Sequence, residues 1–452
     1  MNKNWYTYVV SHLLFPIQER IKSHKTTTIL AELNESQWLS PDEIRDYQRD
    51  RLCRLMQHVV NHVPYYREWF LQSDLTLPDF LQHGAITRLP ILTKEIIREN
   101  LEALKSDQAV GLSRFNTGGS SGEPLVFFIG NERVSHDVAA KWRATRWWDV
   151  DIGDPEIVVW GSPIELGAQG MAQHLRDRMF RTELLPAFEM SQENLHKFVE
   201  RIQKARPDML FGYPSSLAHI ATFAQAEGIV LNDLGIKVVF VTSEQLYDEQ
   251  REVISKIFGC PVANGYGGRD AGFIAHECPA GKLHITAEDI YVEILDNEGN
   301  LLPAGEAGEI VVTHFATKDF PFIRYRTGDV GVLSDEICSC GRGLPVLKEV
   351  QGRTTDFVVA QDGTVMHGLA LIYILRDLDG VALFKITQES LEKTTIEIVV
   401  NDEFDRACEA EIVDQFKARL GQSVTIDLQF VETIANEKSG KFRYVKSLVE
   451  TS

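Results

Sequence analysis

The sequence predicts a large N-terminal α/β domain followed by a small α+β domain, and three observations carry this prediction. The chain has 452 residues, which is too long for one ordinary hydrophobic core. Short apolar strand patterns alternate with helical patterns through its middle, as in α/β folds. From about residue 288 apolar and polar residues alternate around Gly- and Pro-containing turns, which is typical of antiparallel hairpins.

The first segment, MNKNWYTYVVSHLLFPIQER, is apolar and aromatic but lacks the long apolar core and cleavage site of a signal peptide. We expect it to pack on the folded domain; a shallow helix at a membrane surface is the alternative. A helix is predicted over 40–60, where Ser40 and Glu43 form a capping box around Pro41 at the first helical position.

Buried strands of a parallel sheet are predicted at 156–160 (EIVVW) and 238–242 (VVFVT), because both are short, β-branched and almost wholly apolar. Helical patterns at 193–205 and 247–258 lie between or after them. Together with the hairpins that follow, these elements predict mixed sheets with helices and an antiparallel β subdomain.

A last unit begins near residue 356. It reads as a hairpin, a helix at 369–377, two strands, a helix over 404–420 and a further strand, VTIDLQF. The predicted domains are therefore residues 1–355 and 356–452.

Composition excludes several classes of protein. The formal net charge is −19 without a basic stripe, so a nucleic-acid binder is not expected. No run of 18 apolar residues is present, so a transmembrane helix is not expected. The acid excess favours a cytoplasmic protein. The sequence does not decide between a monomer and a dimer.

The stretch FNTGGSSGEPL (115–125) is rich in glycine and hydroxyl side chains. Converging backbone N–H groups make such a loop a cradle for phosphate, and an ordinary surface loop is the alternative. It is not a Walker A loop, because no Gly-Lys-Ser/Thr follows.

Two further stretches place carboxylates beside glycines. NGYGGRDAG (264–272) offers Asp270 for a hard cation such as Mg²⁺, and a tight turn with a solvated Asp is the alternative. RTGD (326–329) offers Asp329 for the two hydroxyls of a ribose, against a surface turn with local ion pairs. Two more stretches offer a basic residue each: Arg353 in GRTTDF and Lys441 in NEKSGKFR.

Taken in order, these five stretches resemble the motifs of the adenylate-forming, or acyl-CoA synthetase-like, superfamily. LPILTKEIIREN (89–100), GYPSSL (212–217), HECPAGKLH (276–284) and CSCGRGLP (338–345) resemble its phenylacetate–CoA ligase-like branch, and within it the capsular-polysaccharide-biosynthesis ligases. The resemblance runs from about residue 40 to the C-terminus and implies an adenylate-forming ligase fold.

The resemblance also implies roles for individual residues. The β/γ-phosphates of ATP would lie on Thr117, Gly118, Gly119, Ser120, Ser121 and Gly122. Ser243, Glu244, Tyr266 and Gly267 would lie near the adenine. Asp270 would serve Mg²⁺, Asp329 and Arg353 would hold the ribose, and Lys441 would bridge the acyl carboxylate and the α-phosphate. The acid itself would contact Tyr213, Pro214, His219 and Gly265, within a pocket drawn from 140–165, 211–219 and 241–268.

Three positions depart from the family pattern. Glu123 stands where many relatives carry Lys, Arg269 where the wider family has Thr, and Asp270 where it has Glu. The shorter Asp270 moves its carboxylate back by about 1.5 Å, one methylene.

Cys278, His284, Cys338 and Cys340 are spaced as Cys-x5-His and Cys-x-Cys. Three thiolates and one imidazole suit a closed, structural Zn²⁺ site, and buried inert cysteines are the alternative. Some relatives hold zinc at matching positions. The remaining cysteines, Cys53, Cys260 and Cys408, are predicted to be small core residues.

The sequence therefore predicts an ATP-dependent ligase that forms an acyl-adenylate from an aryl or other small carboxylic acid and transfers the acyl group to coenzyme A. Two alternatives stay open: transfer to an amine, such as an amino sugar or amino acid, and a non-catalytic nucleotide-binding homologue. Glu123, Arg269 and Asp270 favour the last alternative, whereas Asp329, Arg353 and Lys441 argue against it.

Overall fold

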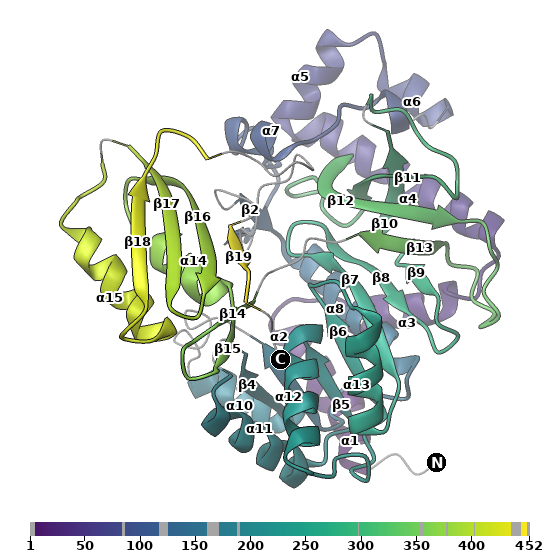
Figure 1. The fold of residues 1–452 in the computed structure, drawn as a ribbon. Helices are drawn as coiled ribbons and strands as arrows, with labels where there is room; N and C mark the ends of the chain where they lie inside the picture. The colour runs from purple at the N-terminus through teal and green to yellow at the C-terminus, as the bar shows by residue number, and fades with distance from the viewer. Residues whose placement is uncertain are drawn as a thin grey trace.

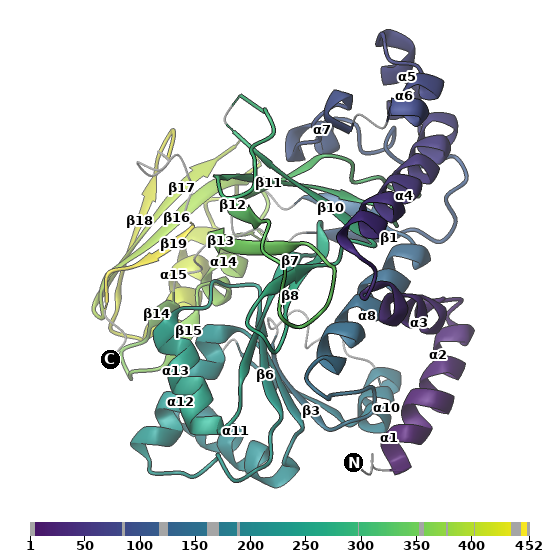
Figure 2. The same ribbon diagram turned by 90° about the vertical axis from the view of Figure 1, so that its right-hand side faces the viewer.

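The structure is a computed structural model, and it describes residues 5–83, 86–116, 125–160, 171–187, 190–296, 298–351, 357–376, 378–401, 403–434 and 444–449. A large body built around an 11-stranded sheet lies beside a smaller C-terminal unit with its own four-stranded sheet (Figure 1). Seen from the side, the first helices run along one flank of the large body (Figure 2).

Helices form most of the first 180 residues. The capping box predicted at Ser40 and Glu43 is confirmed: the backbone N–H of Glu43 donates to Ser40 Oγ, and that of Ser40 donates to Glu43 Oε2 at 2.8 Å. The helices are α1 (Trp5–Val9), the π-helical turn η1 (Val10–Leu14), α2 (Phe15–Ile21), α3 (Thr26–Ser36), α4 (Pro41–His62), α5 (Pro64–Gln72), α6 (Leu77–His83), the 3₁₀ turn η2 (Ile86–Arg88), α7 (Lys94–Glu99), α8 (Asn131–Arg146) and α10 (Met171–Phe180).

The parallel half of the large sheet has the order β7-β6-β5-β3-β4. Its strands are β3 (Glu156–Trp160), β4 (Thr182–Pro186), β5 (Met209–Gly212), β6 (Val238–Thr242) and β7 (Val262–Gly268). The strands predicted at 156–160 and 238–242 are confirmed. Helices α11 (Gln192–Ala205), α12 (Pro214–Ala226) and α13 (Asp248–Phe258) share one core with this half of the sheet.

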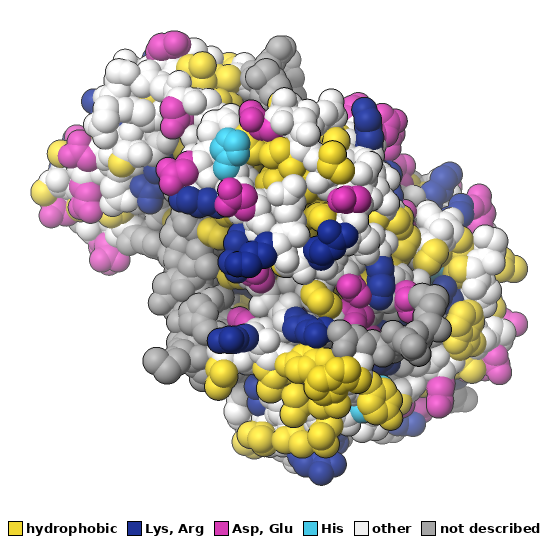
Figure 3. Space-filling view, turned by 90° about the horizontal axis from the view of Figure 1, so that it is seen from below, with side chains coloured by type: hydrophobic (Ala, Val, Ile, Leu, Met, Phe, Trp, Pro, Cys, Tyr) yellow, Lys and Arg dark blue, Asp and Glu magenta, His cyan; other side chains and the backbone are white. Residues whose placement is uncertain are grey.

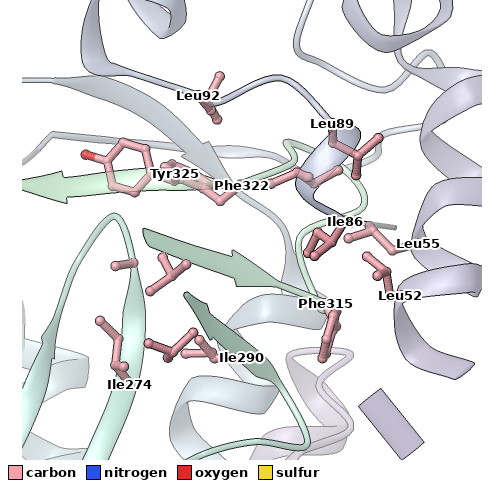
Figure 4. Close-up of a cluster of buried hydrophobic side chains, with 14 of the residues drawn as sticks. Leu52, Leu55, Ile86, Leu89, Leu92, Ile274, Ile290, Phe315, Phe322 and Tyr325 are labelled. Atoms are coloured by element: carbon pink, nitrogen blue, oxygen red, sulfur yellow. The ribbon is translucent and has the colours of Figure 1, made fainter. Parts of the chain in front are cut away.

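The antiparallel half follows in the order β10-β11-β12-β13-β9-β8 and joins the parallel half at β7. Its strands are β8 (Gly272–Glu277), β9 (Leu283–Ile285), β10 (Ile290–Leu295), β11 (Ala307–His314), β12 (Tyr325–Ser334) and β13 (Val346–Gln351). Its core also takes in side chains of α4 and of the segment around Leu89 (Figure 4). The antiparallel hairpins expected beyond residue 288 are confirmed.

The C-terminal unit has a core drawn from its own residues, between Val358 and Val445. Its elements are β14 (Phe357–Val359), β15 (Val365–His367), α14 (Leu369–Arg376), β16 (Val381–Ser390), β17 (Lys393–Val400), α15 (Cys408–Leu420), β18 (Thr425–Phe430) and β19 (Val445–Ser447). The four-stranded sheet has the order β18-β17-β16-β19. The boundary expected between residues 355 and 356 lies outside the described residues and stays a prediction.

A membrane-crossing helix would need a long apolar run, and none of the helices in the described parts of the chain has one.

Candidate active site

Four of the expected substrate and nucleotide residues lie at the carboxyl edge of the parallel strands. Tyr213 follows β5, Ser243 and Glu244 follow β6, and Tyr266 lies in β7. Open α/β sheets bind their ligands at this edge, because the loops that follow the strands form a crevice there.

Two tyrosine–aspartate pairs join the two halves of the sheet. The Tyr266 hydroxyl donates to Asp329 Oδ2 at 3.0 Å, and the Tyr325 hydroxyl donates to Asp270 Oδ2 at 2.6 Å. In the sheet order β8, β9 and β13 separate β7 from β12, so these contacts require the sheet to curl back on itself. Figure 4 shows the Tyr325 ring at the edge of the core with its hydroxyl pointing away from the other labelled side chains.

Burial raises the pKa of Tyr266 well above its usual value, and the neighbouring Asp329 carboxylate raises it further. Tyr266 therefore stays protonated at neutral pH and keeps donating its hydrogen bond. One carboxylate oxygen of Asp329 is held by this bond.

Asp329 lies in a bulge inside β12, where the sequence suggested a turn. Register with β11 shifts so that Val330 pairs with Glu309 but Arg326 pairs with Val311, and Gly328 adopts a φ of +80°. Thr327 Oγ1 donates to the carbonyl of Ile310 and accepts from the backbone N–H of Asp329. Bulges often aim a side chain beside an active site, and this one presents Asp329.

Arg324, which precedes β12, is buried: its side chain is 4% exposed and forms a bidentate pair with the buried Glu293. The guanidinium also donates to the carbonyls of Thr87 and Leu89. Arg324 thus ties β12 to the chain around LPILTKE, the stretch that resembles the phenylacetate–CoA ligase-like branch.

The strand β7 continues through NGYGG, where the sequence suggested a short strand and then a turn. A Cβ on Gly267 would lie 2.3 Å from the carbonyl oxygen of Gly272, so the hairpin with β8 closes only with glycine here. A Cβ on Gly265 would lie 2.9 Å from the Phe240 ring. Both glycines allow close packing directly beside Tyr266.

A buried ion network supports the turn that carries Asp270. The Arg133 guanidinium donates to the carbonyl of Arg269 at 2.7 Å and lies 3.4 Å from Asp137 Oδ2. Asp137 Oδ1 in turn lies 3.5 Å from His314 Nε2. Sequence reasoning missed these three side chains, because no local motif marks residues that α8 and β11 bring together. Within α8, whose sequence is NERVSHDVAAKWRATR, nothing distinguishes Arg133 and Asp137 from the other charged residues, and only His314 lies in a mostly apolar strand.

A second buried pair lies behind that network. His136 Nδ1 is 2.6 Å from Asp289 Oδ1, although the two groups lack hydrogen-bond alignment. Burial alone would raise the pKa of Asp289, but the charge of His136, with Arg51, lowers it to about 2. The Asp289 carboxylate therefore stays charged at neutral pH.

Glu244 binds the first turn of α12. Its Oε2 accepts from the backbone N–H of Ser215 at 3.4 Å and also bonds the Ser215 hydroxyl. A carboxylate is stabilised at a helix N-terminus. The preceding residue, Ser243, is exposed and has a φ of +73°, so it marks a sharp bend at the edge of β6.

The expected acid-binding residues form part of an aromatic wall. The rings of Tyr213 and Trp160 stack with centroids 4.3 Å apart, and Trp160 ends β3 within the expected range 140–165. Pro214 opens α12, which also carries His219. Burial lowers the pKa of His219, so its imidazole is neutral at pH 7.

Several expected residues lie outside the described residues: Thr117, Gly118, Gly119, Ser120, Ser121, Gly122, Glu123, Arg353 and Lys441. The ends of the 117–124 segment are described. Strand β1 (Ser113–Asn116) precedes the segment and strand β2 (Val126–Ile129) follows it. The two strands pair antiparallel, so that Asn116 faces Val126.

The cysteine–histidine set comes together as the spacing predicted. The ligand atoms of Cys278, His284, Cys338 and Cys340 all lie within 4.8 Å of one another. The sulfurs of Cys278 and Cys338 are 3.7 Å apart, close to the ~3.8 Å that two Zn–S bonds of about 2.3 Å span at a tetrahedral angle. His284 Nδ1 is hydrogen-bonded to the Leu344 carbonyl, which orients the ring. The other ring nitrogen, Nε2, faces the cysteines and lies 3.2 Å from Cys340 Sγ.

Comparison with known proteins gives two family matches and several relatives. Residues 184–316 match the AMP-binding enzyme family, and residues 358–448 match the CapK C-terminal domain. Protein CapK of Staphylococcus aureus is 24% identical over 407 residues, which cover 89% of each chain. Phenylacetate-coenzyme A ligase of Pseudomonas putida is 24% identical over 425 residues, 89% of this chain and 94% of that protein.

The fold is also that of a solved ligase. The chain superposes on 2-hydroxyisobutyryl-CoA ligase, solved with 2-HIB-AMP and CoA, with a TM-score of 0.62 at 18% identity over 91% of each chain. The predicted fold class and resemblance are confirmed. The matches to the AMP-binding enzyme family, to CapK and to phenylacetate-coenzyme A ligases therefore support an adenylate-forming enzyme of the phenylacetate–CoA ligase-like kind, similar to CapK.

Proposed function

We propose that this ligase activates a small carboxylic acid with ATP and transfers the acyl group to coenzyme A. The observation that carries the proposal is the pair of tyrosine-held carboxylates, Asp270 and Asp329, at the carboxyl edge of the parallel strands. The relatives that are named phenylacetate–CoA ligases support the choice of coenzyme A.

The chemistry follows from charge. A carboxylate is a poor electrophile, and its attack on the α-phosphorus of ATP yields an acyl-adenylate and pyrophosphate. Negative charge accumulates in the transition state, and Lys441 together with the loop Thr117–Gly122 would stabilise it. Asp329 and Arg353 would orient the ribose. Asp270 would hold Mg²⁺, which supplies charge neutralisation at the phosphates when bound.

The Cys278–His284–Cys338–Cys340 set would hold a structural Zn²⁺. Four protein ligands close a tetrahedral site and leave no position for a substrate. The metal would join β8, β9 and the segment before β13, and it takes no part in adenylation.

The test is a variant of the expected catalytic lysine. A panel of carboxylic acids first identifies the substrate by pyrophosphate release. Lys441→Ala should then lower ATP–pyrophosphate exchange by about 10²–10³-fold, because one charge contact in the transition state is lost. It should spare thioester formation from acyl-adenylate supplied ready-made.

Lys438→Ala is the matched control, because it removes a lysine from the same segment three residues earlier. Exchange should be unchanged in this variant. Normal exchange by Lys441→Ala, or an equal loss in both variants, would remove Lys441 from the mechanism.

A second acceptor is favoured by one observation. Residues 358–448 match the CapK C-terminal domain, whereas the relatives that support coenzyme A are named phenylacetate-coenzyme A ligases. The alternative acceptor is an amine, giving an amide. Incubation with ATP, the identified acid and either CoA or an amino sugar, followed by mass spectrometry, separates the two functions.

A further inference from the structure

The N-terminal helical segment has one face that packs on the large body. Val10 and Phe15 are almost fully buried, and the Phe15 ring contacts that of Phe180 at the end of α10. The Tyr6 hydroxyl donates to the carbonyl of Met179 at 2.8 Å. The expectation that this segment packs on the domain therefore holds for this face.

The same segment presents a second apolar row to solvent. Its members are large, and each is about half or more exposed: Trp5 (74%), Tyr8 (58%), Leu13 (55%), Ile17 (49%) and Ile21 (80%). We call this row the N-terminal apolar face. Seen from below, hydrophobic side chains gather into a broad patch near the lower edge of the molecule, with lysine and arginine side chains beside it (Figure 3).

The backbone is shaped to keep this row on one side. The row advances in steps of three, five, four and four residues, and a five-residue step does not fit a regular α-helix. That step, from Tyr8 to Leu13, is spanned by the π-helical turn η1, whose hydrogen bonds join residues five apart. The irregular turn thus aligns the two helices into one apolar face.

The exposed charged side chains of residues 5–25 are all basic. Arg20, Lys22 and Lys25 are exposed, whereas the acid that precedes them, Glu19, is buried and bonded to Thr26. The first 31 residues hold four Lys or Arg and one acid, in a chain that has 46 Lys and Arg against 65 acids. The basic residues therefore concentrate where the apolar row is exposed.

We propose that the N-terminal apolar face docks the enzyme on the surface of an anionic lipid bilayer. An apolar row with Trp and Tyr beside basic side chains is typical of helices that lie in the headgroup region. The aromatic rings would sit among the headgroups, and the basic side chains would contact lipid phosphates. The segment would lie on the bilayer and not cross it.

A second copy of the chain is the competing occupant of this face. A two-fold dimer brings the same patch of each copy together, so Arg20, Lys22 and Lys25 would meet their own counterparts. Like charges across an interface oppose association. An anionic surface has the complementary charge, and we therefore favour it.

The test is co-sedimentation of the full-length protein with vesicles. Vesicles of phosphatidylcholine mixed equally with phosphatidylglycerol should bind the protein, and high salt should weaken this binding. Trp5→Ser/Leu13→Ser/Ile21→Ser should lower the partition coefficient by about 100-fold or more. Arg20→Gln/Lys22→Gln/Lys25→Gln should lower it by about 100-fold on anionic vesicles and little on pure phosphatidylcholine.

The matched control is Leu71→Ser/Val110→Ser/Val230→Ser, which removes three equally exposed apolar side chains elsewhere. It should bind vesicles as the wild type does. Circular dichroism checks that all variants are folded. Absence of wild-type binding to anionic vesicles overturns the proposal. So does a dimer, seen by analytical ultracentrifugation, that only the Trp5/Leu13/Ile21 variant loses.

Discussion

The carboxylates of Asp329 and Asp270 are each held by a tyrosine hydroxyl from a different part of the fold. Each bond restrains the rotation of the carboxylate that accepts it. A pre-oriented acceptor loses less entropy when it binds a ribose or a cation. We therefore expect the tyrosines to act on a bound nucleotide through the aspartates.

We expect Tyr266→Phe to weaken AMP binding by about fivefold to tenfold, because one hydrogen bond to a charged group is lost. Asp329→Asn should weaken it further, since the charge of the acceptor is removed as well. Isothermal titration calorimetry with AMP measures both without knowledge of the acid substrate. Tyr65→Phe, on α5, is the control. Equal AMP affinity in all four proteins would exclude Asp329 as a ribose contact.

Burial lowers the pKa of His314, and the contact with Asp137 offsets only part of this effect. The unfolded chain, with a His pKa of about 6.5, therefore binds a proton that the folded chain rejects. The free energy of unfolding should fall as the pH is lowered from 7 towards the depressed folded pKa.

His314→Gln should reduce this pH dependence by up to about 1.4 kcal/mol per pH unit. Urea unfolding at pH 7 and at pH 5 measures the difference for each protein. An unchanged pH dependence would mean that His314 is protonated in the folded state.

At the scale of elements, the segment that carries Cys338 and Cys340 fastens the antiparallel strands to the N-terminal helices. The Arg342 guanidinium donates to the side chain of Gln37 at 3.0 Å and lies over the Trp38 and Trp147 rings. A Cβ on Gly343 would lie 1.9 Å from the carbonyl of Leu39, so only glycine allows this approach. A metal at the cysteine–histidine set would hold the segment in this position.

Removal of the metal should therefore destabilise the enzyme as a whole. Cys338→Ser, or treatment with a chelator, should abolish bound zinc and lower the Tm by about 5 °C or more. Cys408→Ser, in the C-terminal unit, should leave both unchanged. Elemental analysis and differential scanning fluorimetry are the measurements. Wild-type protein that is purified without chelator and contains no zinc would refute the site.

At the scale of the whole molecule, the C-terminal unit has a closed core and its own sheet. Lys441 belongs to this unit by sequence, whereas the tyrosine–aspartate pairs belong to the large body. We propose that the small domain, residues 356–452, turns about Asp356 between adenylation and transfer, as domain closures do around other active sites.

Residues 356–452 expressed alone should unfold in one cooperative thermal transition, because the core requires no side chain of the large body. Residues 1–355 alone should keep AMP binding, measured by calorimetry, and lose adenylation. A C-terminal fragment without near-UV circular dichroism would show that the core depends on the large body.

The sequence by itself determined the local elements and the chemistry of the motifs. The helix at 40–60 and the strands at 156–160 and 238–242 depend on nearby residues, through caps and apolar periodicity. The spacing of the cysteines and the histidine was enough to predict the candidate metal site. The order of glycine-rich and acidic motifs was enough to identify the ligase family, because each motif is short and continuous.

Only the tertiary structure decided which partners these motifs meet. The curl that brings β7 to β12 and the link from Arg133 to the Asp270 turn join residues more than 60 positions apart. The bulge that aims Asp329 depends on the pairing of β12 with another strand, β11. Such contacts depend on packing geometry, which local spacing does not encode. The same holds for the N-terminal segment, whose apolar residues divide between core and solvent only when the body is folded.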